Sequence, residues 1–185
     1  MLSTVDRTQL FAVHMHALVE VGGMVGKYCD RAEHVEGPLA VFSEVGEALR
    51  TQAFTLAARL GEDLAHLYAV RLAEVEQRNP AYHPGAFDGA RAVREAVTWR
   101  DWQLAQIEHD RVYHPDVVGM AKIDQMRHYA FHLQYLSWLA LQASRDAALQ
   151  VGYIRQRIAD VLLFGLKFAT IGNQRLPEQP VTVLA

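Results

Sequence analysis

The chain has 185 residues, of which 51% are hydrophobic, and this size suits one domain with a substantial core. Its 18 basic and 21 acidic residues give a net charge of −3, which provides no electrostatic reason to expect a nucleic-acid or anionic-membrane partner. The single cysteine excludes an intramolecular disulfide and a cysteine-based zinc site.

Apolar residues recur at helical spacing almost throughout the chain, which predicts an all-α, single-domain bundle of five to six helices. The first helix is expected over residues 3–29, and Gly37 with Pro38 opens the second. Gly61 either breaks this helical pattern or bends it before it resumes as far as Arg78. The sequence leaves open whether the second and third helices form one bent rod.

A connector rich in proline and glycine, residues 79–85, separates these helices from the second half of the chain. Three further helices are expected there, over residues 88–112, 117–143 and 144–172. The last residues contain two prolines and cannot continue helical hydrogen bonding. We therefore expect a helical bundle domain over residues 1–172 and an irregular tail over residues 173–185.

Asp124, His128 and His132 recur at every fourth position, so a helix projects all three from one face, and Tyr135 extends this stripe. A carboxylate and two imidazoles in line can present metal ligands or proton carriers. The structural alternative is that Asp124 pairs with Arg127 and that the histidines form hydrogen bonds between helices. On the first interpretation, His128 and His132 are the catalytic residues and Asp124 is a metal ligand.

Residues 108–116 form a second cluster of titratable groups, at the expected end of a helix. A tight turn after it would bring this segment back against Asp124 and His128. The structural alternative is a solvated helix end, where a histidine complements the helix dipole. We consider His109 a candidate for contact with a ligand.

Glu44 and Glu47 are three residues apart and are therefore neighbours on a helix, while Asp160 precedes a long apolar run. Paired carboxylates bind hard divalent cations such as Mg²⁺ through oxygen. Alternatively, the two glutamates are ordinary surface residues and Asp160 pairs with Arg157 or Arg155.

Two short segments resemble the motifs of the MazG-like all-α nucleotide pyrophosphohydrolases. Residues 44–49 resemble the first acidic motif, and residues 158–164 look like the second. The resemblance implies that Glu44, Glu47 and Asp160 hold Mg²⁺, which positions water against a nucleoside triphosphate.

The resemblance permits a second alignment. Arg157 stands where the second motif usually has glutamate, and the two segments lie further apart than in the family. If the helix over residues 128–139 is the counterpart of the first motif, His132 and Tyr135 replace its acids. The first interpretation of function is therefore a pyrophosphohydrolase, or a nucleotide-binding relative with an altered metal site.

In this mechanism His128 or His132 acts as the base, because imidazole titrates near neutral pH. The metal ligands are expected among Glu44, Glu47, Asp124 and Asp160, and the residues that contact a nucleotide-like ligand among Arg127, Tyr135, Lys167 and His109.

Two other functions remain open. Mixed carboxylate and imidazole residues are similar to the ligand sets of helical non-haem iron proteins, including haem-oxygenase-like oxidases, which would bind Fe or Mn instead of Mg²⁺. A non-catalytic dimerisation or binding protein would use Trp99, Trp102 and Trp138 as a contact surface. We expect a homo-oligomer with a small-molecule ligand and with no nucleic-acid or membrane partner. A cytoplasmic location is expected because no signal sequence or long apolar run is seen.

Overall fold

The structure is a computed structural model that describes residues 9, 12–13, 15–16, 19–20, 22–27, 39–144 and 151–181. Residues 39–144 and 151–181 form seven helices and no strand. These are α2 (Leu39–Leu60), α3 (Leu64–Arg78), α4 (Gly89–Glu95), α5 (Trp99–Tyr113), α6 (Pro115–Val118), α7 (Lys122–Ser144) and α8 (Val151–Ile171). The predicted all-α, single-domain bundle is thus confirmed. In the part of the chain described, no helix combines the length and apolar character needed to cross a membrane.

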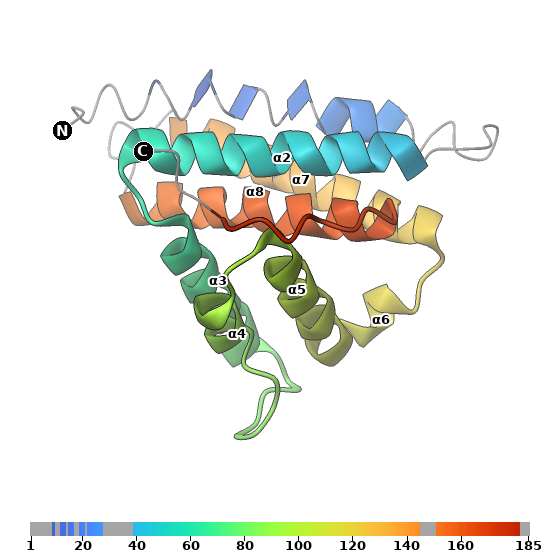
Figure 1. The fold of residues 1–185 in the computed structure, drawn as a ribbon. Helices are drawn as coiled ribbons and strands as arrows, with labels where there is room; N and C mark the ends of the chain where they lie inside the picture. The colour runs from blue at the N-terminus through green and yellow to red at the C-terminus, as the bar shows by residue number, and fades with distance from the viewer. Residues whose placement is uncertain are drawn as a thin grey trace.

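Helices α2 and α8 lie side by side and form the upper layer of the molecule in Figure 1, with α3, α4 and α5 below them. Their chains run antiparallel, because Ser43 Oγ donates to Gly172 O (3.2 Å) while Arg50, two turns further along α2, donates to Gly165 O (3.1 Å). The backbones touch at Gly46, where an added Cβ atom would lie 2.8 Å from Ala169 N. Glycine at position 46 therefore sets the distance between α2 and α8.

Local signals divide two of the expected helices. Gly61 adopts a left-handed φ of +66°, and the Asp63 side chain then caps α3 by accepting from His66 N at 3.1 Å. The second and third helices are therefore separate and do not form one bent rod. The expected helix over residues 88–112 is also divided, because Thr98 and Asp101 form a capping box that starts α5 after α4 has ended.

The structure describes only part of the segments predicted at the two ends of the chain. The described residues before residue 28 are helical, and the rest of the expected first helix lies outside the described residues. The same holds for residues 145–150, where the start of the last helix was expected. The described part of the tail, residues 172–181, runs back along α8 (Figure 1). It is held in place by the buried side chain of Leu176 and by the bond from Val181 N to Val97 O (3.0 Å).

Helix α7 packs along α8 through aromatic contacts. The Tyr129 ring meets Phe164 and Phe168 edge-on, with centroids 5.9 Å apart in both cases. This packing turns the α7 face that carries His128 and His132 toward the middle of α8, where Asp160 and Lys167 lie.

Candidate functional site

A cavity of about 470 Å³ lies between α3, the α5–α6 junction, α7 and α8. We call it the α3–α7–α8 cavity. Its lining includes apolar and aromatic side chains, among them Leu163 and Phe164, and five of the ten site residues expected from the sequence. Its polar lining consists of Arg71, His114, Asp116, His128, His132, Tyr135, Arg157, Asp160 and Lys167.

Helical spacing explains why these groups meet. Arg157, Asp160 and Lys167 follow one another at intervals of three and seven residues, so α8 presents them on one face. His128 and His132 are one turn apart on α7, and their ring centroids lie 4.6 Å from each other. The four-residue stripe predicted from the sequence therefore has its two imidazoles and Tyr135 at one cavity.

Asp160 is almost fully buried, with 3% of its surface exposed, and lies between two guanidinium groups. Arg71 Nε donates to Asp160 Oδ1 at 2.7 Å, and Arg157 NH2 forms an ion pair with Oδ2 at 2.8 Å. Both oxygens of this carboxylate thus face cations that belong to the protein itself. Such a buried pairing is stable only while both charges are present.

Arg157 has donors that this arrangement does not use. The residue is 6% exposed, and its Nε and NH1 atoms are buried without a hydrogen-bond acceptor among the described residues. The face of the guanidinium lies over the Tyr153 ring, 5.1 Å from its centroid. Buried donors without acceptors are unfavourable, so these two nitrogens favour the entry of an oxygen-bearing ligand.

Lys167 is held at the cavity wall by a second, deeper set of polar groups. Its Nζ donates to Asp110 Oδ1 at 2.8 Å and lies 5.3 Å above the Tyr129 ring. Gln106 Nε2 donates to the same Asp110 oxygen at 2.9 Å, and the Tyr68 hydroxyl donates to Gln106. Burial opposes ionisation of Asp110, but the Lys167 ammonium and the His109 hydrogen bond outweigh it and hold the pKa of this carboxyl below its usual value.

Burial also controls the histidines of the cavity. It lowers the pKa of His114 to about 4, with Lys167 adding to the effect. The pKa values of His128 and His132 are lowered as well, first by burial and then by neighbouring positive charge, from Lys167 at both residues and from His128 at His132. All three imidazoles are therefore neutral at pH 7 and able to take up a proton.

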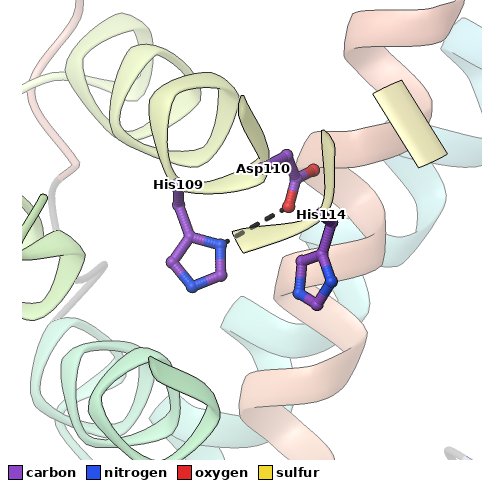
Figure 2. A group of neighbouring side chains, drawn as sticks. All are labelled: His109, Asp110 and His114. Atoms are coloured by element: carbon purple, nitrogen blue, oxygen red, sulfur yellow. Dashed lines mark hydrogen bonds and ion pairs between the residues drawn. The ribbon is translucent and has the colours of Figure 1, made fainter. Parts of the chain in front are cut away.

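His109, Asp110 and His114 form the tightest group of potential metal ligands in the described part of the chain (Figure 2). Each offers one ligand atom, and these atoms lie within 4.8 Å of one another. However, Lys167 Nζ and Gln106 Nε2 already bind the Asp110 oxygen that faces the group. An ammonium ion at this carboxylate repels a divalent cation, so the donor set does not fit a metal, whether Mg²⁺ or the alternative Fe or Mn.

The expected magnesium ligands do not meet. Glu44 and Glu47 are exposed on α2, and Asp124 is exposed at the start of α7, where it pairs with Arg127 at 3.4 Å. The antiparallel packing of α2 on α8 leaves Glu47 about 10 Å from Asp160 along the helix axis. The described residues therefore do not form the Mg²⁺ site expected from these four acids, because only Asp160 points into the cavity and arginines already neutralise it.

The residues expected to contact a ligand fall into three groups. Tyr135 and Lys167 line the α3–α7–α8 cavity together with His128 and His132. His109 lies one layer deeper, 3.4 Å from Asp110, and Arg127 is not among the lining residues.

Four polar residues of the cavity were not among the expected site residues: Arg71, His114, Asp116 and Arg157. Arg71 was missed because it comes from α3, far away in the chain and without any motif, and only the tertiary packing brings it to Asp160. His114 was seen only as part of a cluster at a helix end. The structure places His114 at the same cavity as His128.

Comparison of this chain with protein-family models, with curated proteins and with solved structures finds no significant match. The relation to the MazG-like proteins therefore stays a prediction. The two alignments with the MazG-like motifs place the first motif on different helices, and only one of these helices shares a cavity with the second motif. The segment on α7 shares a cavity with Asp160, whereas the segment with Glu44 and Glu47 does not.

Proposed function

We propose that this protein binds a phosphorylated, nucleotide-like small molecule in the α3–α7–α8 cavity, as a nucleotide-binding relative of the MazG-like proteins with an altered metal site. The observation that carries the proposal is Arg157, a guanidinium residue that lines the cavity and whose Nε and NH1 atoms are buried without an acceptor in the described residues. A phosphate group offers oxygens at the spacing that a guanidinium matches with two parallel hydrogen bonds.

The remaining cavity groups suit the same ligand. Lys167 supplies a second cation, and the neutral imidazoles of His128 and His132 supply hydrogen bonds that become stronger if they take up a proton. Asp160 offsets much of the arginine charge, so we expect affinity to come from directed hydrogen bonds more than from net charge.

The aromatic part of the cavity suits a planar group such as a nucleobase. Phe164 and Tyr129 line it, and the His132 ring stacks on Phe164 with centroids 5.7 Å apart. The Tyr135 ring at the cavity stacks on Trp138 at 6.1 Å. The volume of about 470 Å³ lies in the usual range for small-molecule sites.

Binding is expected not to require Mg²⁺. In the described structure the guanidinium groups of Arg71 and Arg157 face both oxygens of Asp160, the one acid of the expected metal set that lines the cavity. A cation that belongs to the protein thus takes the role that a metal ion would have toward a phosphate.

Isothermal titration calorimetry tests this proposal. Inorganic phosphate, a nucleoside monophosphate and a nucleoside triphosphate are titrated into the protein, once in EDTA and once in Mg²⁺. We expect a nucleotide to bind with the same affinity in both buffers. Binding of none of the three contradicts the proposal, and Mg²⁺-dependent release of pyrophosphate from the triphosphate favours the hydrolase interpretation instead.

Variants of two arginines on α8 locate the site. Arg157→Gln removes the charged donors and is expected to weaken nucleotide binding by about 1.5–3 kcal/mol, roughly 10- to 100-fold. Arg157→Lys keeps the charge but not the forked geometry, and we expect an intermediate loss. Arg155→Gln is the matched control, because this exposed arginine pairs with Glu62 outside the cavity. Equal affinity of all four proteins would show that the ligand binds elsewhere.

A further inference from the structure

We infer that Asp110 is a positioning residue of this site: it keeps Lys167 as an ammonium ion and fixes it at the wall of the α3–α7–α8 cavity, where it contacts the bound anion. The inference rests on the proposed function and assigns a role to the buried layer behind Lys167. In the sequence, Asp110 is one member of the titratable cluster over residues 108–116.

The contacts of the Asp110 carboxylate suit it to bind a cation. Its side chain is almost fully buried, and its Oδ1 accepts from Lys167 Nζ at 2.8 Å and from Gln106 Nε2 at 2.9 Å. The Tyr68 hydroxyl in turn donates to the side-chain amide oxygen of Gln106. This chain of hydrogen bonds from α3 through α5 fixes the carboxylate, so Lys167 has one defined position in place of many rotamers.

Asp110 acts on a ligand only through Lys167. Lys167 lines the α3–α7–α8 cavity, whereas Asp110 is not among its lining residues. Asp110 instead lines a second recess of about 150 Å³ between α5, α7 and α8, which Lys167 and Tyr129 also line. Direct contact between Asp110 and a ligand in the cavity is therefore not expected, and an effect of Asp110 on binding reports on the lysine.

The surroundings of Lys167 make this partner necessary. The lysine is 8% exposed, and a buried charge needs an opposite charge or hydrogen bonds beside it. The other ionisable groups near it come from all the packed elements: Arg71 on α3, His109 and His114 at the end of α5, Asp116 on α6, His128, Tyr129 and His132 on α7, and Arg157 and Asp160 on α8. Both arginines of the cavity pair with Asp160, and among the described residues Asp110 is the carboxylate that contacts Lys167 directly.

The test uses Asp110→Asn, which keeps the shape of the side chain and its ability to accept hydrogen bonds. Glu95→Gln is the matched control, because Glu95 is exposed and pairs only with Arg91 among the described contacts. Binding of a nucleoside monophosphate is measured by calorimetry at pH 6, 7 and 8. The ratio of variant to wild-type Kd is expected to be about 10 at pH 8 and smaller at pH 6, because the variant lacks the carboxylate that favours the charged form of its partner.

A purely structural role of Asp110 predicts a ratio that does not change with pH. A double-mutant cycle adds a second readout. Lys167→Met should weaken binding about tenfold in the wild type but by less than about threefold in the Asp110→Asn background, because the two residues act as one unit. Additive losses would overturn the inference.

An NMR titration of the Lys167 side chain without ligand keeps the test independent of the proposed function and of folding defects. In folded Asp110→Asn, the Lys167 signal should titrate at a lower pH than in the wild type, and in Glu95→Gln it should not move. An unchanged titration in folded Asp110→Asn overturns the inference alone. Failure of the wild type to bind any phosphorylated probe at these pH values overturns the proposed function and the ligand role of Asp110 together.

Discussion

The protonation of His128 and His132 is a property of their position in the cavity. Burial lowers the pKa of both histidines, and the nearby positive charge of Lys167 lowers it further. In the free protein both imidazoles are therefore neutral at pH 7. A bound phosphate would reverse this balance, because a neighbouring anion stabilises the imidazolium form.

This reversal predicts a pH dependence of binding. The bound state holds more protons than the free state, so affinity for a nucleoside phosphate should rise as the pH falls from 8 to 6, by up to about tenfold per pH unit for each proton taken up. Calorimetry at several pH values measures it. A variant with His128→Gln and His132→Gln serves as the comparison, since protonation of the ligand itself affects both proteins equally. Parallel pH profiles of the two proteins would contradict this account.

Part of the site could be predicted from single residues. Spacing alone identified His128, His132 and Tyr135, because a helix turns every fourth residue to one face and this face carries polar groups. On α2, Phe42, Val45 and Leu49 form the buried stripe and leave Glu44 and Glu47 exposed, a pattern that helical spacing already predicts. Arg71 could not be predicted, because only tertiary packing brings α3 to Asp160.

At the scale of helices, the contact of α2 with α8 depends on two glycines. A Cβ atom added to Gly46 would lie 2.9 Å from Gly165 O, and one added to Gly165 would lie 3.0 Å from Arg50 N. Both clashes involve backbone atoms, which cannot move aside without separating the helices. Since α8 also carries Arg157, Asp160 and Lys167, this contact fixes the frame of the cavity.

Substitution of Gly46 tests the importance of this contact. Gly46→Ala should destabilise the protein by about 1–3 kcal/mol, because the close helix crossing must open. Gly152→Ala on α8 is the control: its added Cβ meets nothing within 4 Å, and the better helix propensity of alanine should stabilise the protein by about 0.5–1 kcal/mol. Urea denaturation measures both changes. A neutral or stabilising effect of Gly46→Ala would contradict the close packing.

Helix boundaries were less predictable than helix content. Apolar periodicity runs through Thr98 and Asp101 without interruption, and it therefore predicted one helix where α4 and α5 are separate. The capping box between these two residues ends the continuity, since Thr98 leaves the helical conformation to accept from Asp101 N at 3.1 Å. This capping box can be recognised in the sequence, but the apolar periodicity of the surrounding residues continues across it.

At the scale of the whole molecule, homo-oligomer formation stays a prediction. Of the tryptophans expected to form a contact surface, Trp102 is buried in the core and Trp99 packs against it, with ring centroids 5.5 Å apart. Trp138 is exposed, and it shares one face of α7 with Phe131 and Tyr135, which are also exposed. If a second copy of the chain covers this face, it also borders the cavity that Tyr135 lines.

Light scattering after size exclusion measures the oligomeric state directly. The prediction is a mass above that of one chain for the wild type, and a shift toward the monomer for Trp138→Ser. Val97→Ser removes an exposed apolar side chain away from α7 and should leave the mass unchanged. A monomeric wild type contradicts the prediction, and an unaltered oligomer of Trp138→Ser assigns the contact to another surface.

The central claim is that the α3–α7–α8 cavity holds a phosphate through Arg157 without a metal ion. A crystal structure of the protein with a nucleoside monophosphate, grown from EDTA-treated material, tests it most directly. We predict phosphate oxygens within hydrogen-bonding distance of Arg157 Nε and NH1, with the Arg71–Asp160 pair intact. A nucleotide bound outside this cavity, or one that leaves Arg157 Nε and NH1 without an acceptor, would contradict the account.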